Sequence, residues 1–116
     1  TGLWYQVVDQ GQREGNYLES SVSAMMMYTY AKGYNKGYLG RKYLKAANEV
    51  LDGLIAHRIV ANEDATISLT YCCAVSGLGG NPYRDGSFEY YVNERIRNND
   101  GKATGPFILD CLELGR

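Results

Sequence analysis

Residues 41–58 carry the most regular amphipathic pattern in the chain. Their apolar side chains recur three or four positions apart, as on one side of an α-helix, whereas charged residues such as Lys45 and Asp52 lie on the other side. The apolar set consists of Tyr43, Leu44, Ala47, Val50, Leu51, Leu54 and Ile55. A second helical repeat covers about residues 17–32 and stops at Gly33. Because only a short, glycine-broken link joins the two repeats, the pattern predicts an antiparallel helical hairpin.

The remaining predicted elements are shorter. Residues 65–71 alternate apolar and polar side chains with a period of two, which predicts a short strand or β-hairpin. Residues 77–86 are rich in glycine and predict a loop. Ser87 can cap a short helix that ends near Asn93, and Pro106 suits the first position of a last helix. The chain therefore reads as mainly helical and belongs to the all-α class.

The composition excludes several classes of partner. Twelve basic and 13 acidic residues give a net charge of −1 with no block of like charge, so no nucleic acid or membrane surface is expected to bind. No signal peptide or membrane-spanning run is visible in the sequence. The three cysteines, of which Cys72 and Cys73 are adjacent, fit buried free thiols better than a disulfide framework. No zinc motif or phosphate-binding loop is present, so we expect no metal and no cofactor.

Aromatic and polar side chains gather in residues 1–33, around the start of the first predicted helix. Trp4 and Tyr17 could be stacking platforms for a sugar or aromatic residues of the core. Gln6 and Glu19 could bind sugar hydroxyls, although Glu19 would equally suit the first turn of a helix. Ser21 could also bind a hydroxyl, but capping and close helix packing are alternatives for it. This stretch is the best candidate for a sugar-binding cleft.

Two further residues, Arg84 and His57, are candidate functional groups. Arg84 could bind a substrate carboxylate with both guanidinium nitrogens, and its structural alternative is an ion pair with Asp85 or Glu89. His57 is the only histidine and lies near the end of the second helix, where a solvated position is expected. A nucleophilic triad is therefore not credible in this chain.

Four runs of the sequence carry a resemblance to a known family: TGLWYQVVDQ, REGNYLESSVSAMMMYTYAKG, GLGGNPYRDGSFEYYV and GPFILDCLEL. In this order they resemble the carboxyl-terminal half of glycoside hydrolase family 105, the unsaturated rhamnogalacturonyl hydrolases. The resemblance implies an (α/α)6 barrel of six helical hairpins, of which residues 1–116 would be a carboxyl-terminal fragment. Such a fragment is expected to expose apolar faces and to associate through them with itself or with its other half.

The resemblance also implies a reaction. Members hydrolyse the terminal 4,5-unsaturated uronic acid of pectin-type oligosaccharides that a lyase has produced, by adding water across the C4=C5 bond. The family's catalytic aspartate lies in the amino-terminal half, so this chain should hold no catalytic residue and should be inactive alone. Its expected contribution is contact with the oligosaccharide. The candidate residues are Trp4, Gln6, Tyr17, Glu19, Ser21 and Arg84.

Two alternatives stay open at this point. The chain could be a non-catalytic carbohydrate-binding or helical scaffold module, complete at this length. It could also derive from another (α/α)6 barrel enzyme, such as a sugar isomerase or epimerase. Those enzymes rely on histidines, and the presence of His57 alone argues against them.

Overall fold

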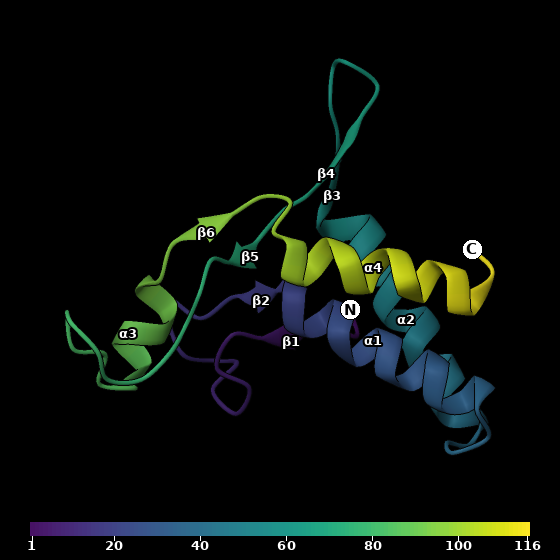
Figure 1. Cartoon of the computed structure of the whole chain (residues 1–116), viewed down its shortest axis with the longest axis horizontal. Helices are drawn as coiled ribbons and strands as arrows, with labels where there is room; N and C mark the ends of the chain where they lie inside the picture. The colour runs from purple at the N-terminus through teal and green to yellow at the C-terminus, as the bar shows by residue number, and fades with distance from the viewer.

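The computed structural model describes the whole chain, Thr1 to Arg116. Three helices pack side by side, and short strands and loops extend from one end of them (Figure 1). In chain order the elements are β1 (Trp4–Tyr5), β2 (Leu18–Glu19), α1 (Ser20–Asn35), α2 (Arg41–His57), β3 (Ile59–Ala61), β4 (Ile67–Leu69), β5 (Cys72–Cys73), α3 (Phe88–Asn93), β6 (Ile96–Arg97) and α4 (Gly101–Leu114).

Helix α1 is the centre of the helical body and packs against both α2 and α4. It runs antiparallel to α2, as the sequence predicts, and in the same direction as α4 (Figure 1). Where α1 and α4 end, the side-chain amide of Asn35 donates to the backbone oxygen of Glu113 over 2.8 Å. The buried core combines residues of α1, α2 and α4 with one residue each of β4 and β5: Ala24, Met27, Ala31, Ala47, Val50, Leu51, Leu54, Leu69, Cys72 and Ala103. Small side chains on α1 allow its neighbours to approach closely.

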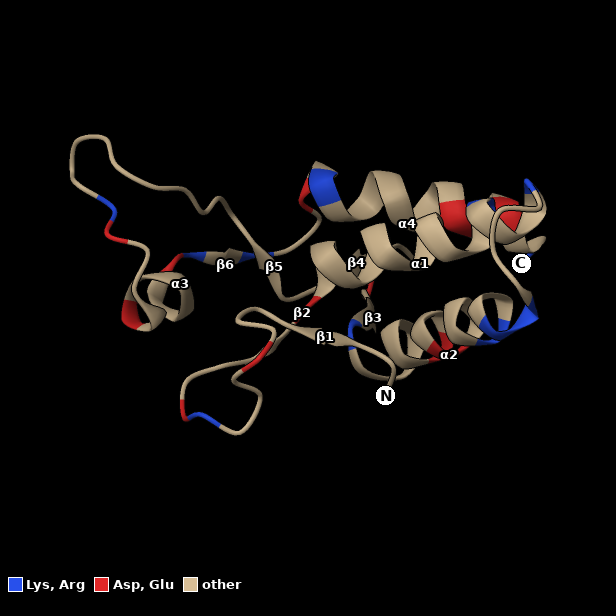
Figure 2. Cartoon of the chain, turned by 90° about the horizontal axis from the view of Figure 1, so that it is seen from below, with Lys and Arg blue, Asp and Glu red and all other residues tan.

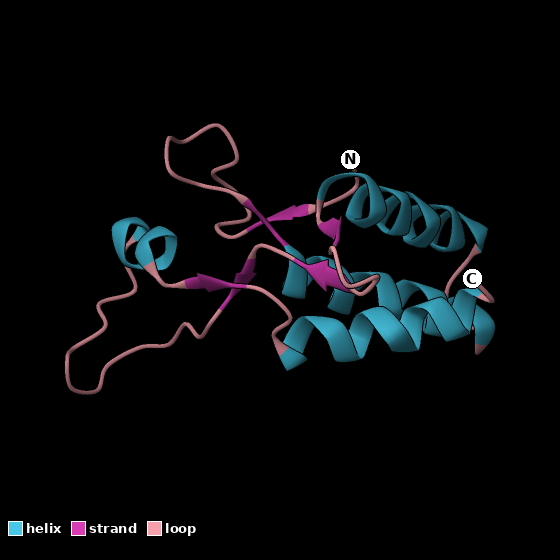
Figure 3. Cartoon of the chain, turned by 90° about the horizontal axis from the view of Figure 1, so that it is seen from above, coloured by secondary structure: helices cyan, strands magenta, loops and turns pink.

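The strands form three separate antiparallel ribbons, β1–β2, β3–β4 and β5–β6. Figure 3 shows the β1–β2 and β5–β6 ribbons beside the helical body, on the side where α1 and α4 begin. The strand predicted over residues 65–71 is confirmed in a shorter form, Ile67–Leu69, and pairs with Ile59–Ala61. Strands this short depend on the helices for their stability, because an isolated two-stranded ribbon is marginal in water.

Two predicted boundaries are wrong. Gly33 does not end α1, which continues to Asn35. A Cβ at Gly33 would lie 2.6 Å from Leu39, so glycine is needed there for the returning link rather than as a stop. Helix α4 begins at Gly101, so Pro106 lies inside it and not at its first position. Asp100 sets that earlier start, because its carboxylate accepts a hydrogen bond of 2.9 Å from the Lys102 amide.

Charged residues of both signs are interspersed over the helices and loops (Figure 2). None of the helices combines the length and the hydropathy that crossing a membrane would require.

Candidate functional site

The β1–β2 ribbon brings four of the predicted site residues to one place. Trp4 lies opposite Glu19 in the ribbon, and the Gln6 amide donates to the Tyr17 carbonyl over 2.8 Å. Side chains opposite each other in an antiparallel pair lie on the same side, and positions two apart share that side. All four side chains therefore emerge from one side of the ribbon, directly before the start of α1.

Glu19 has a structural role in this arrangement. Its side chain is only 1% exposed and caps α1, where Oε2 accepts from the Val22 amide over 2.7 Å. Oε1 accepts from the Ser21 hydroxyl over 2.7 Å and from the Cys73 amide over 2.8 Å. Glu19 is thus the N-cap rather than a first-turn residue, and its carboxylate joins α1 to β5. Ser21 is buried with it, so both residues face the protein here.

Gln6 bridges the ribbon and the β5–α3 region. Its side-chain amide nitrogen, Nε2, lies 3.3 Å from the Cys73 sulfur, 3.3 Å from the Ser76 hydroxyl and 3.2 Å from the Tyr91 carbonyl. These contacts fix the amide nitrogen and leave the amide oxygen without a hydrogen bond. That oxygen can accept a hydrogen bond from a ligand hydroxyl.

Trp4 and Tyr17 provide the aromatic surface of the ribbon, and both are partly buried. Trp4 is held through its backbone amide, which donates to the Ser23 hydroxyl over 2.9 Å. The Tyr17 hydroxyl is buried and has no hydrogen-bond partner. Burial raises the pKa of this phenol further above its usual range, so it stays protonated and able to donate. The hydroxyl is closed off by the surrounding protein, so it is the ring of Tyr17 that can contribute to a contact surface.

Arg84 does not join this group. It lies in the glycine-rich loop, where its side chain donates to the carbonyls of Gly79 over 2.9 Å and Leu78 over 3.2 Å. A Cβ at Gly77 would lie 2.5 Å from the guanidinium, so glycine makes room for the arginine inside its own loop. This loop, with Tyr90 and Glu94, borders a separate cleft of about 600 Å³.

The ion pair considered for Arg84 is wrong. Asp85 instead accepts a hydrogen bond of 2.9 Å from the Ser87 backbone amide. Hydrogen bonding to Ser87 lowers the pKa of Asp85. Glu89 pairs with Arg13 at 2.9 Å. The Arg84 guanidinium therefore donates to two backbone oxygens and forms no ion pair with either acid.

A carboxylate of the protein already caps the start of α1 and of α4, the two helices that run in the same direction. Asp100 caps α4 and is 4% exposed, and its Oδ1 lies 2.8 Å from the Lys102 ammonium. The hydrogen bond from Lys102, together with that from Arg97, holds the pKa of Asp100 well below its usual range. Because Glu19 fills the same position on α1, neither helix start is open to the carboxylate of a ligand.

Comparison with known proteins assigns the chain to a family. The model of Glycosyl Hydrolase Family 88 matches residues 1–116. The chain belongs to this family. Protein Atu3128 of Agrobacterium fabrum (strain C58) is 37% identical over 118 residues, which cover 97% of the chain and 51% of that protein. The chain thus spans about half the length of the curated relatives it matches.

This family 88 chain is also similar to solved structures described as members of glycoside hydrolase family 105. A family 105 glycoside hydrolase from C. acetobutylicum ATCC 824 is 46% identical, with a TM-score of 0.93 over 97% of the chain and 31% of that structure. A possible family 105 member from Salmonella enterica serovar Paratyphi A is 20% identical with a TM-score of 0.73, which shows a shared fold. The resemblance to family 105 that the sequence motifs indicate is therefore confirmed.

Three residues of this family 88 chain contribute to the site although sequence reasoning did not select them. Cys73 binds the Glu19 carboxylate through its amide and contacts the Gln6 amide through its sulfur. Tyr71 lies beside Tyr17 with ring centroids 6.2 Å apart, and Arg58 lies 4.3 Å above the Tyr71 ring. No local pattern marks these residues, because the contacts join segments that are far apart in the sequence.

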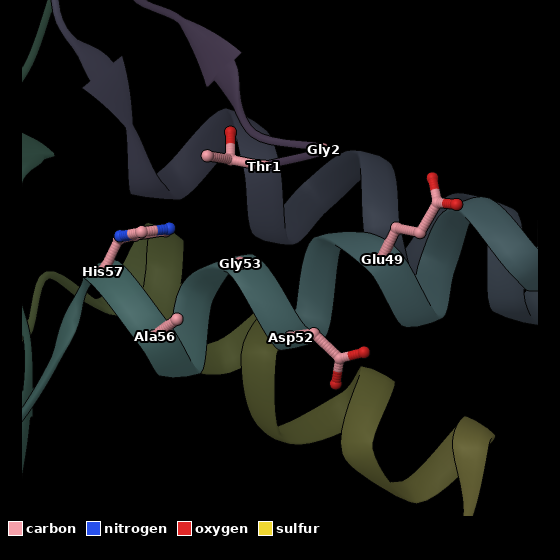
Figure 4. A pocket seen from close by; sticks show the side chains of 7 residues that line it. All are labelled: Thr1, Gly2, Glu49, Asp52, Gly53, Ala56 and His57. Carbon is pink, nitrogen blue, oxygen red and sulfur yellow. The ribbon is translucent and has the colours of Figure 1, made fainter.

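A second hollow, of about 330 Å³, lies on the outer side of α2 (Figure 4). Its lining includes Glu49, Asp52 and His57, and Thr1 crosses α2 at Gly53. Gly53 permits this crossing, since a Cβ there would collide with the Thr1 carbonyl. No group of three or more His, Cys, Asp and Glu side chains in the chain is arranged to hold a metal ion. The hollow is a place where the chain packs across a helix and contains none of the predicted site residues.

Proposed function

We propose that residues 1–116 form the carboxyl-terminal part of an (α/α)6-barrel glycoside hydrolase that removes a terminal 4,5-unsaturated uronic acid from lyase-generated, pectin-type oligosaccharides. The observation that carries the proposal is the 46% identity and 0.93 TM-score to a family 105 hydrolase of which the chain covers 31%. Helices α1 and α2 would be one hairpin of that barrel.

Exposed apolar residues support a larger parent. Ile108 and Leu112 on α4 and Ile67 on β4 are all more than half exposed. Ile108 and Leu112, with Phe107, also border a cleft of about 320 Å³. Surfaces of this kind usually mark contacts with another chain or with the rest of a fold. In the parent the other hairpins would cover this face, and the isolated chain is expected to associate through it.

The carboxylates near the ribbon support a division of labour within the parent. The reaction needs one carboxyl group that gives a proton to C4 while a water molecule adds at C5. The resulting hemiketal then collapses and releases the neighbouring sugar. Glu19 is held by three protein donors and Asp100 by two cations. Neither is suited to donate the proton, which supports a proton donor in another part of the parent protein.

The role left to this chain is to hold the substrate. Trp4 can stack on the apolar side of a sugar ring. The Gln6 amide oxygen can accept from a sugar hydroxyl, and the Tyr17 ring adds to the aromatic surface. Glu19 and Ser21 would position this surface by fixing the start of α1. Arg84 lies apart from this surface, in the glycine-rich loop beside the separate cleft.

Turnover of lyase products tests the reaction. The full-length protein should remove the ultraviolet absorbance of the conjugated double bond from unsaturated rhamnogalacturonan or galacturonan oligosaccharides. Lyase products of ulvan and of glycosaminoglycans serve as comparison substrates. Unchanged absorbance with every one of these products would contradict the proposed reaction.

Replacement of Trp4 tests the substrate-holding role. In the full-length protein, Trp4→Ala should raise KM about tenfold, because loss of the ring removes a stacking surface. Trp4→Phe keeps an aromatic ring and should raise KM less. Steady-state kinetics with circular dichroism spectra of both variants provides the measurement. Equal KM values for the wild type and Trp4→Ala would return Trp4 to a packing role.

A further inference from the structure

Arg58 and Tyr71 form a cation–aromatic pair beside the candidate site. The Arg58 guanidinium carbon lies 4.3 Å from the centre of the Tyr71 ring. Tyr71 is 44% exposed, although its ring is flanked by both Arg58 and Tyr17. A large aromatic residue that stays exposed under an arginine offers both an apolar surface and a positive charge to a ligand.

The backbone holds this pair in place. The amide and the hydroxyl of Thr70 both donate to the Arg58 carbonyl over 2.9 Å, and the Ser20 amide donates to the Tyr71 carbonyl over 3.0 Å. Arg58 is therefore tied to the residue that precedes Tyr71, and Tyr71 is tied to the first residue of α1. A pair held in this way loses little conformational freedom when a ligand binds.

Arg58 keeps part of its binding capacity free. Its Nε donates to the Leu18 carbonyl over 3.1 Å and its Nη1 to the His57 carbonyl over 2.8 Å. No carboxylate lies within ion-pair distance of it, unlike the guanidinium of Arg97, which pairs with Asp100. Its Nη2 has no hydrogen-bond acceptor. The charge of Arg58 is thus available to an anionic ligand.

The backbone at Tyr71 is unusual for this residue type. Its φ angle is 59°, in the left-handed region that favours glycine. A bulky side chain there costs free energy that glycine would not. Residues held in such sparsely populated backbone regions gather at ligand-binding and active sites, which makes Tyr71 a candidate functional residue.

We propose that Arg58 and Tyr71 form a subsite for a uronate residue of the oligosaccharide, in which Arg58 binds the carboxylate and Tyr71 stacks on the sugar ring. The proposal rests on the proposed function for the class of ligand. Both helix starts at this end are already filled by Glu19 and Asp100, so an arginine side chain is the group left to bind a carboxylate here. The short distance between the Tyr17 and Tyr71 rings makes the subsite continuous with the β1–β2 ribbon.

Binding of trigalacturonate, a saturated uronate that the proposed reaction cannot consume, tests the subsite. Calorimetry on the full-length protein should show that Arg58→Gln weakens binding about tenfold. Arg41→Gln is the matched control, because Arg41 is exposed at the other end of the same helix and its loss changes the net charge equally. The methyl ester of trigalacturonate keeps the rings but lacks the charges, and it should bind the wild type and Arg58→Gln equally.

Replacement of Tyr71 separates binding from stability. Tyr71→Gly should also weaken trigalacturonate binding about tenfold. Relief of the strain at the positive φ angle offsets part of the loss of the Arg58 and Tyr17 contacts, so this variant should stay folded, as circular dichroism can verify. An equal affinity of Arg58→Gln and Arg41→Gln, or unchanged affinity of a folded Tyr71→Gly variant, would overturn the subsite.

The two proposals fail in different ways. Turnover of unsaturated uronides together with Arg58-independent binding of trigalacturonate would remove the subsite and leave the reaction standing. Arg58-dependent binding without turnover of any unsaturated uronide would remove the reaction and leave the subsite standing. Absence of any trigalacturonate binding by the wild type would overturn the subsite.

Discussion

Replacing Glu19 with alanine should lower the free energy of unfolding by about 4 kcal/mol, since hydrogen bonds to a buried charged group contribute roughly 1.5–3 kcal/mol each. The variant loses the N-cap of α1 and leaves the amides of Val22 and Cys73 and the Ser21 hydroxyl without their acceptor. Urea denaturation followed by circular dichroism provides the measurement. The expected loss is large because one side chain joins the start of α1 to β5.

Ser21→Ala is the matched control for this prediction. It removes only one of the three donors to Glu19, so the expected loss is about 1 kcal/mol. If Glu19→Ala were no less stable than Ser21→Ala, the carboxylate would not have the joining role described here. A stable but kinetically impaired Glu19→Ala variant would instead favour direct contact of Glu19 with substrate.

Replacing Asp110 with leucine should have the opposite effect and stabilise the protein at alkaline pH. Asp110 lies inside the helical body with 0% exposure, and neither carboxylate oxygen has a hydrogen-bond partner. Burial, with a smaller contribution from nearby Glu113, raises the pKa of Asp110 to about 7. The ionised form is therefore poorly accommodated in the folded protein.

The pH dependence of this effect follows from the direction of the shift. The folded state holds the proton more tightly than the unfolded chain, so ionisation of Asp110 costs stability progressively between about pH 4 and pH 7 and fully above that range. Asp110→Leu should gain on the order of 4 kcal/mol at pH 8, since each pKa unit corresponds to about 1.4 kcal/mol, and should gain far less at pH 4. Urea denaturation at both pH values measures the difference.

Asp110→Asn separates charge from polarity. It removes the ionisation but leaves a buried amide without partners, so its stability should lose the pH dependence and gain less than that of Asp110→Leu. The stability difference between Asp110→Leu and the wild type could instead be the same at pH 4 and pH 8. That result would show that the carboxylate is solvated or paired in solution.

The sequence predicts a helix well where its local pattern agrees with its tertiary contacts, as for α2 and α3. Helix α2 ends one residue before its predicted end, and Ser87 caps α3 through a hydrogen bond of 3.1 Å from the Tyr90 amide. Gly33 is typical of a helix end and Pro106 of a helix start, but the surrounding structure overrides both signals. Gly33 accommodates Leu39, and Asp100 starts α4 before the proline.

The site was only partly predictable for the same reason. The sequence predicts Trp4, Gln6, Tyr17 and Glu19 as site residues within one stretch, and the ribbon brings them together. The role of Glu19 depends on Cys73, which is 54 residues away in the chain. Contacts over such distances leave no local spacing to read, and the isolation of Arg84 within its own loop likewise became visible only in the structure.

We propose that this chain holds the substrate while the proton donor lies elsewhere in the parent protein. The most direct measurement compares the full-length protein with residues 1–116 alone, at equal molar concentration, in the ultraviolet assay with an unsaturated rhamnogalacturonan disaccharide. We expect loss of absorbance with the full-length protein and none with residues 1–116. Turnover by residues 1–116 alone would contradict it.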